Sequence, residues 1–231
     1  MLCNQYCYNN PVAAAAQERR RYDASGRRQR AEATRAAVIA EAARLFVEHG
    51  YVHTSIGGIA EAAGVSSRTV FGAFGSKAHL LKHVIDAAVV GDIDPVPLHQ
   101  RPQLRRFHES ATFDDACDRL GEVFEAVAPR THAIYRVVDR AADSDQDIRA
   151  LKSDLDRQRL TGTGLMADTF ARLLGVSDDD GWTRVRDILW LLGSPQQYGL
   201  LVEDRGWSPA AYRAWTVQAL RQLLPTRVSG G

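Results

Sequence analysis

Apolar residues recur every three or four positions along most of this 231-residue chain, which is the spacing of one face of a helix. The first such run follows Arg35 and stops at Gly50, a residue type that suits the left-handed end of a helix. Residues that cap helices then open three short segments, which predict helices over 56–63, 66–74 and 76–90. No alternation of apolar and polar residues persists long enough to indicate a strand. The pattern therefore predicts an all-α protein.

Beyond residue 90 the helical period pauses and then returns. Residues 91–111 hold three prolines and predict a connector with a short helix near Leu104. Further helices are predicted over 113–127, 130–142, 146–174, 181–202 and 208–224. The last has the clearest limits, because Ser208 can cap it, Pro209 suits its first position and Pro225 ends it.

Three parts follow from this pattern. Residues 1–30 lack apolar periodicity and are rich in arginine, so we expect a disordered basic arm. Residues 31–83 form the compact helical unit, and residues 84–231 form a larger helical bundle.

Composition narrows the class of protein. With 45% hydrophobic and 25% charged residues, the chain is typical of soluble globular proteins, and it contains neither a membrane-spanning run nor the apolar segment of a signal peptide. Three cysteines, Cys3, Cys7 and Cys117, are too few for a disulfide framework. We therefore expect a cytoplasmic protein.

Charge is distributed unevenly. Residues 1–82 carry 11 lysines and arginines against 6 acidic residues, whereas residues 83–231 carry 18 against 22. A basic end on an acidic body is expected when that end meets a polyanion. The alternative is a solvated, arginine-rich tail without a partner.

The helices at 56–63 and 66–74 are spaced as a helix-turn-helix. Gly64 permits a positive φ in the turn and Val65 fills the gap between the helices. Arg68 can make a bidentate contact with guanine, and neighbouring hydroxyls can reach bases or phosphates. The alternative is an αα-corner with capping serines. The residues expected to meet DNA are Thr54, Ser55, Ser66, Ser67, Arg68, Thr69, Phe71, Gly72 and Lys77.

Residues 33–83 resemble the DNA-binding domain of the TetR (tetracycline-repressor) family nearly position by position. The residues that carry the resemblance are Ile39, Ala42, Leu45, Phe46, Gly50, Tyr51, Thr54, Ser55, Ile56, Ile59, Ala60, Ala63, Gly64, Val65, Ser66, Thr69, Val70, Phe71, Phe74, Ser76, Lys77, Leu80 and Leu81. The resemblance implies that the chain binds a palindromic operator as a dimer. Beyond residue 90 it implies only an α-helical ligand-binding and dimerisation domain, in which a small molecule moves the two DNA-reading heads out of register.

The chain departs from that family at several positions. The family commonly has a tyrosine, which contacts a phosphate, where this chain has Phe71. Bulky polar residues are usual where Gly72 and Ala73 stand, and charged ones where Gly57 and Gly58 stand. These departures shift the expected specificity toward Ser67, Arg68 and Thr69.

Basic residues just upstream of the first helix, namely Arg27, Arg28 and Arg30, could enter the adjacent minor groove as an arm. A tail whose charge is incidental remains the alternative.

A sensor domain needs an apolar cavity with a few orienting polar groups. The candidate lining residues are Phe124, Tyr135, Arg136, Asp139, Met166, Phe170 and Trp190. A broad apolar block in the last two predicted helices suggests a dimer interface, although a central helix in a monomer is the alternative. The candidate interface residues are Trp190, Leu191, Tyr198, Leu201 and Trp215.

No catalytic motif is evident, so we expect no enzyme, no cofactor and no metal site. His79 and His83 have metal-ligand spacing but lack the glutamate of a His-Glu-x-x-His motif. The favoured reading is a dimeric repressor released from a palindromic operator by a small molecule. One alternative is a DNA-binding regulator without an effector, and another is an all-α enzyme or carrier whose first helices are only structural.

Overall fold

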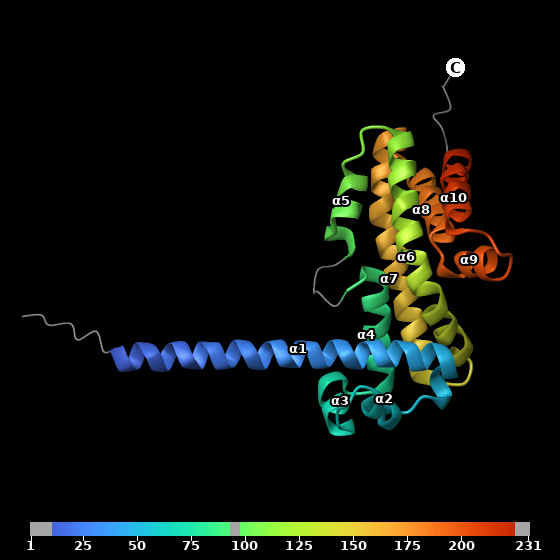
Figure 1. Cartoon of the computed structure of the whole chain (residues 1–231). Helices are drawn as coiled ribbons and strands as arrows, with labels where there is room; N and C mark the ends of the chain where they lie inside the picture. Colours follow the sequence, from blue (N-terminus) through green and yellow to red (C-terminus); the bar gives the residue numbers. More distant parts are fainter. Residues whose placement is uncertain (1–10, 93–97, 225–231) are drawn as a thin grey trace, which may run out of the picture.

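The computed structural model describes residues 11–92 and 98–224, with side chains from residue 26 onward in the first range. These residues form helices joined by short loops, with no strand among them (Figure 1), which confirms the predicted fold class. The elements in order are α1 (Pro11–His53), α2 (Ile56–Ala62), α3 (Ser67–Phe74), α4 (Lys77–Val90), the 3-10 turn η1 (Leu98–Gln100), α5 (Pro102–His108), α6 (Phe113–Ala142), α7 (Gln146–Leu174), α8 (Asp179–Leu192), α9 (Pro195–Tyr198), the π-helical turn η2 (Gly199–Glu203) and α10 (Pro209–Leu223).

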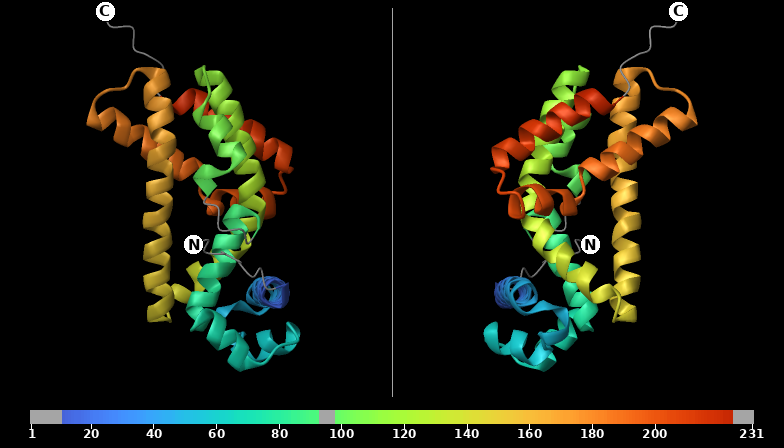
Figure 2. Two further views of the ribbon diagram at one scale, coloured as in Figure 1. Left: turned by 90° about the vertical axis from the view of Figure 1, so that its left-hand side faces the viewer. Right: turned by 90° about the vertical axis from the view of Figure 1, so that its right-hand side faces the viewer.

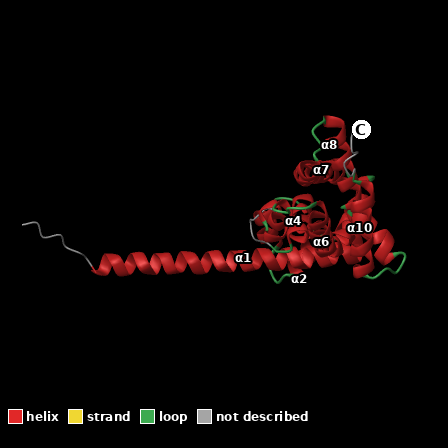
Figure 3. Cartoon of the chain, turned by 90° about the horizontal axis from the view of Figure 1, so that it is seen from above, coloured by secondary structure: helices red, strands yellow, loops and turns green. Residues whose placement is uncertain are grey.

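The chain forms a small head, α1 to α4, and a taller body, α5 to α10 (Figure 1). In the body, α7 and α8 pack together on one side, while α6 and α10 pack together on the other (Figure 2). Seen from above, α1 extends far beyond the rest of the molecule (Figure 3).

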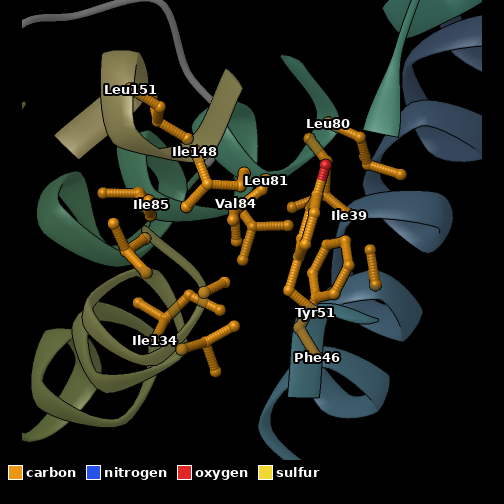
Figure 4. Packing of buried hydrophobic residues seen from close by; sticks show 14 of the residues in the cluster. Ile39, Phe46, Tyr51, Leu80, Leu81, Val84, Ile85, Ile134, Ile148 and Leu151 are labelled. Atoms are coloured by element: carbon orange, nitrogen blue, oxygen red, sulfur yellow. The ribbon is translucent and has the colours of Figure 1, made fainter. Parts of the chain in front are cut away.

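The core of the head continues into the body. Phe46, Ile59 and Leu81 are fully buried in the head, and the same cluster of buried side chains includes Ile134 and Ile148 from α6 and α7 (Figure 4). Helix α4 joins the two parts, because it crosses the predicted boundary at residues 83 and 84 without a break. Close-packed side chains therefore connect α4 to both parts of the molecule.

Residues 11–30 differ from the sequence-based expectation of a disordered arm. They are helical and continuous with the first predicted helix, which Gly50 ends with a φ of 77°. The expectation rested on the absence of an apolar face, but Ala13 to Ala16 and the following Gln and Arg residues favour helix by intrinsic propensity. Residues 1–10 lie outside the described ranges.

Two helices predicted over 113–127 and 130–142 are a single helix, α6, with Pro129 inside it. The side chain of Pro129 is exposed, so its ring meets solvent rather than a packed neighbour. Leu120 and Ile134 are buried on either side of the proline. Packing therefore holds both halves on one axis despite the hydrogen bond that proline cannot donate.

The helix predicted over 181–202 is broken instead. Helix α8 ends at Leu192, and Ser194 has an extended backbone with ψ of 128°. The physical reason is Pro195, because a residue that precedes proline is disfavoured in the helical region. The predicted helices over 146–174 and 208–224 match α7 and α10, with Ser208 as the cap and Pro209 in the first turn of α10.

Candidate nucleic-acid interface and internal cavity

The turn between α2 and α3 has the geometry that a helix-turn-helix needs. Gly64 has a φ of 67°, a backbone conformation that side-chain-bearing residues rarely adopt. The amide of Val65 donates to the carbonyl of Ala60 at 2.9 Å, which closes the turn. At the start of α2, the hydroxyl of Ser55 accepts a hydrogen bond from the amide of Gly58, so Ser55 is a helix cap.

Helix α3 separates its faces sharply. Val70 and Phe74 are buried against the head core, whereas Ser67, Arg68 and Gly72 are exposed on the other side. The structure thus presents Ser67 and Arg68 in the first turn of α3, where unpaired backbone amides and the positive helix end attract phosphate.

The remaining candidates on α3 have mixed roles. The hydroxyl of Ser66 accepts from the amide of Thr69 at 3.1 Å and lies 2.9 Å from its hydroxyl, so this pair caps the helix while staying exposed. The ring of Phe71 is 52% exposed. A large apolar side chain in that position is available to a partner, but it has no hydroxyl to offer a phosphate.

Thr54 is engaged inside the protein, contrary to its prediction as a DNA contact. Its side chain is buried, and its hydroxyl donates to the carbonyls of Leu45 and Gly50 at 3.1 and 2.8 Å. Gly50 ends the first helical segment, so its carbonyl is one that a helix end leaves without an intrahelical partner. Thr54 therefore closes the C-terminal end of the first helical segment rather than facing DNA.

Lys77 also turns inward. Its ammonium group donates to the carbonyls of Tyr51 and Thr54 at 2.9 and 3.0 Å and lies 4.1 Å from the centre of the Tyr51 ring. Burial lowers the pKa of Lys77, and burial raises the pKa of Tyr51 to about 12. Lys77 therefore ties α4 to the end of α1, and the prediction that it reaches DNA is not supported by this geometry.

Arg35 is a structural residue of the head that the sequence reasoning missed. It donates to the carbonyl of Ala73 at 3.0 Å, lies 4.5 Å from the ring centre of Phe74 and contacts the His83 imidazole at 3.0 Å. A cation at the C-terminal end of α3 is favourably placed with respect to the helix dipole. Arg35 thereby fixes α3 to α1 and α4.

The arginines predicted to enter the minor groove lie on α1. Arg27, Arg28 and Arg30 are exposed, and Arg28 pairs with Glu32 at 2.9 Å across one helical turn. This part of α1 continues past α3 in Figure 1. The head therefore extends in that direction as a helix and not as an extended segment of chain.

The body encloses a cavity of about 680 Å³, within the size range of small-molecule sites. Phe124, Tyr135 and Met166, three of the predicted lining residues, line it. The walls come from α4, η1, α5, α6, α7, the segment that follows α8, and α10. Most of these wall residues are apolar.

The other four predicted lining residues lie elsewhere. Phe170 is fully buried in the core of the body, and Arg136 is exposed on α6. Asp139 pairs with Lys152 and accepts from Gln196. Trp190 lies one layer behind the wall, where its ring is stacked under a guanidinium that does line the cavity.

That guanidinium belongs to Arg159, which the sequence reasoning did not select. The cavity also exposes Lys82 and Asp86, which pair at 2.7 Å, and two tyrosines, Tyr135 and Tyr212. An arginine in the middle of a predicted helix resembles a surface residue in the sequence, so no local signal identified it.

The predicted dimer residues divide into exposed and buried groups. Leu191 is 53% exposed on α8, and Leu201 is half-buried in η2. Trp215 is half-buried on α10, where its ring meets that of Trp207 edge to face. Tyr198 is buried within the chain between Tyr212 and His132, so it cannot contribute to an interface as the sequence predicted. Trp190 is half-buried under Arg159.

The part of the chain that the structure describes gives little support for a metal site, a membrane-spanning helix or a reactive thiol. Within those residues no three His, Cys, Asp or Glu side chains are grouped to hold a metal ion, and no helix is long and apolar enough to cross a membrane. Burial raises the pKa of the Cys117 thiol to about 12, which leaves it unreactive.

Residues 38–84 match the family model described as bacterial regulatory proteins, tetR family. A structure assigned to the TetR-family transcriptional regulators from Mesorhizobium loti has a TM-score of 0.62 at 19% identity, with 84% of this chain and 96% of that chain covered. NalD of Pseudomonas aeruginosa, described as the secondary repressor of the MexAB-OprM multidrug efflux pump, has a TM-score of 0.61 at 21% identity, with 84% and 98% covered.

A third structure, assigned to the same family and from Rhodococcus sp., has a TM-score of 0.60 at 14% identity, with 83% and 98% covered. At these identities the structures show a shared fold. No curated protein matches the sequence significantly.

Proposed function

We propose that this chain, a member of the tetR family of bacterial regulatory proteins, is a dimeric, sequence-specific repressor that a small molecule releases from a palindromic operator. The members of that family are transcriptional regulators and not enzymes. Such a repressor acts in the cytoplasm, where the chromosome is accessible. The observation that carries the proposal is the position of α4. This helix follows directly after the exposed, capped recognition helix α3 and also lines the internal cavity.

The recognition face consists of the first turns of α3. Arg68 is exposed there next to Ser67, at the helix end where backbone amides attract phosphate. An arginine in a major groove can bind the O6 and N7 atoms of guanine in a bidentate manner. Phe71, being half-exposed, can contact the methyl group of thymine, which reads sequence without a hydroxyl.

Release by a small molecule is supported by the position of α4. Ile85 and Val89 of α4 line the cavity, and Ile85 also belongs, with Leu81 and Val84, to the core that the head shares with the body. Arg130 of α6 donates to the carbonyls of Ala88 and Val89 at the C-terminal end of α4. A ligand that shifts α4 in the body therefore also shifts the head. A regulator without an effector would leave this cavity without a role.

A palindromic operator requires two heads related by two-fold symmetry. Two leucines of the body, Leu191 on α8 and Leu200 in η2, are 53% and 59% exposed, and burial of such side chains stabilises a dimer. We expect Leu191→Asp to be monomeric in sedimentation velocity. Val47→Asp, at an apolar residue of α1 that is 48% exposed, is the matched control and should remain dimeric.

The proposal is tested by selecting binding sequences from a pool of random duplexes with the full chain. The expected result is an enriched palindrome whose half-sites lie about one helical turn, or a multiple of it, apart. Enrichment of a single half-site would contradict the dimer, and a pool without any enriched sequence would contradict sequence-specific DNA binding.

A further inference from the structure

We propose that the cavity binds an organic carboxylate with an apolar body, and that Arg159 holds the carboxylate group. The inference rests on the proposed function in one respect, because it assigns a chemical class to the effector of that function. It otherwise depends on the cavity alone.

Arg159 is a buried cation with few partners. Its side chain is 14% exposed, and one of its five N–H donors binds the carbonyl of Trp190 at 2.9 Å. A carboxylate oxygen of Asp156 lies 3.9 Å from its Nη1 atom, beyond hydrogen-bond length. Burial lowers the pKa of Arg159. The guanidinium thus bears a desolvation cost that a bound carboxylate would offset.

The arginine is also held in a fixed orientation. Its guanidinium lies 4.8 Å from the centre of the Trp190 ring, a stacking arrangement that leaves its planar edge for a ligand. The bidentate pairing of guanidinium and carboxylate uses such an edge. A preorganised cation gains affinity because little side-chain freedom is lost on binding.

Tyr135 supplies a hydroxyl to the same cavity. Tyr135 of α6 and Arg159 of α7 both line it. Burial raises the pKa of Tyr135 to about 12, so the phenol stays protonated and can donate to a carboxylate oxygen.

A second tyrosine also lines the cavity. Tyr212 is fully buried, and its hydroxyl makes no hydrogen bond of normal length and angle among the residues that the structure describes. Burial raises the pKa of Tyr212, although the Thr216 side chain lies near enough to lower this pKa in part. Buried hydroxyl groups are normally paired. Tyr212 lies on α10, whereas Arg159 lies on α7, so the cavity has polar groups on separate helices and apolar walls between them.

The balance of charge favours an anion. Lys82 and Asp86 both line the cavity and neutralise each other at 2.7 Å, and burial lowers the pKa of the lining residue His108. Of the lysine and arginine side chains that line the cavity among the described residues, Arg159 is the one that no carboxylate contacts within hydrogen-bond length. The rest of the wall is mainly aliphatic and aromatic, which requires an apolar body on the ligand.

The experiment compares acids with alcohols of the same skeleton, without DNA. Phenylbutanoate and dodecanoate are titrated by calorimetry into the full chain, with phenylbutanol and dodecanol as uncharged partners. We expect at least one acid to bind tenfold or more tightly than its alcohol, since charge-assisted hydrogen bonds contribute about 1.5–3 kcal/mol and 1.4 kcal/mol corresponds to tenfold.

Variants identify the site. Arg159→Gln should weaken the acid by about tenfold or more and leave the alcohol unchanged. Arg157→Gln, on the same helix with a side chain that is 74% exposed, is the matched control and should bind like the wild type. Tyr135→Phe retains the ring and should weaken the acid alone by a smaller factor, which keeps the assignment testable if Arg159→Gln fails to fold.

Filling the cavity provides the complementary test. Gly162 lines the cavity, and a Cβ added there would meet nothing within 4 Å. Gly162→Phe should therefore abolish binding of acid and alcohol alike. Equal affinities for acid and alcohol, or an Arg159→Gln variant that binds the acid as tightly as the wild type, would overturn the proposal.

The two proposals can fail separately. If the acid binds through Arg159 but leaves operator affinity unchanged, the carboxylate site stands and the ligand-release part of the proposed function fails. If neutral molecules release the operator while no acid binds, the proposed function stands and the carboxylate site is wrong.

Discussion

The head and the body place their polar side chains in opposite ways. In the head, candidate binding groups such as Ser67 and Arg68 are exposed on a short, capped helix. In the body, Tyr135 and Arg159 come from different helices and face an internal cavity. The proposed function assigns DNA binding to the exposed groups of the head and ligand binding to the cavity of the body. One core of buried side chains joins the two parts (Figure 4).

The largest expected effect is the difference in stability between replacing a buried and an exposed phenylalanine of the head. Phe46 is fully buried and Phe71 is 52% exposed. Phe46→Ala should lower the free energy of unfolding by about 3–5 kcal/mol because it leaves a cavity. Phe71→Ala should change the free energy of unfolding by less than about 0.5 kcal/mol. Urea unfolding measures both, and equal losses would show that the head lacks the packed core described above.

A smaller effect is expected to distinguish two cations of the head, Lys77 and Arg68. Lys77→Gln removes hydrogen bonds from a charged donor to two carbonyls and should lower the free energy of unfolding by about 1.5–3 kcal/mol. Arg68→Ala should leave the free energy of unfolding within about 0.5 kcal/mol and weaken specific DNA binding by about 1–3 kcal/mol. Thermal unfolding and operator titration of both variants measure this contrast. An Arg68→Ala variant that is unstable but binds DNA normally would reverse the roles.

The protonation of two histidines, one in the head and one in the body, gives a further comparison between these parts. Burial is the main cause that lowers the pKa of His83 in the head and of His108 in the body. The unfolded chain then takes up protons first, so stability is complete above about pH 6.5 and is lost as the pH falls below that value. We expect His83→Gln and His108→Gln each to flatten the dependence of the melting temperature on pH. An unchanged pH profile in either variant would show that the replaced histidine does not contribute to the pH dependence of stability.

The smallest expected effect concerns two glycines of the helix-turn-helix. Gly72 lies inside α3 and a Cβ there would meet nothing within 4 Å, so Gly72→Ala should stabilise the protein by about 0.5–1 kcal/mol. Gly64 has a φ of 67°, and Gly64→Ala should destabilise it by at least as much. The melting temperatures of the two variants measure the difference, and a shift in the same direction would contradict the turn geometry.

Most of the head could be predicted because its signals are local. Capping serines, the glycine of the turn and the apolar spacing lie within a few residues of the structures that they determine. The inward direction of Lys77 was not predictable in this way, because its acceptor on Tyr51 lies 26 residues earlier in the chain. A lysine in the first turn of a helix looks the same in the sequence whether it faces solvent or a carbonyl.

The body was less predictable because its site is assembled from distant residues. Aromatic residues such as Phe124 and Tyr135 were selected by type, and both line the cavity. Arg159 was missed because burial of an arginine depends on tertiary packing, here against Trp190. The break at Pro195, by contrast, had a local signal that the long apolar pattern obscured.

The most direct test of the account is a titration of the full chain with the duplex selected from the random pool and with a shuffled duplex of the same composition. The account predicts that the selected duplex binds about a thousandfold or more tightly, that raising the salt weakens both complexes, and that Arg68→Ala removes part of the difference between them. Equal affinity for the two duplexes, unaffected by Arg68→Ala, would contradict the claim that the exposed face of α3 reads DNA.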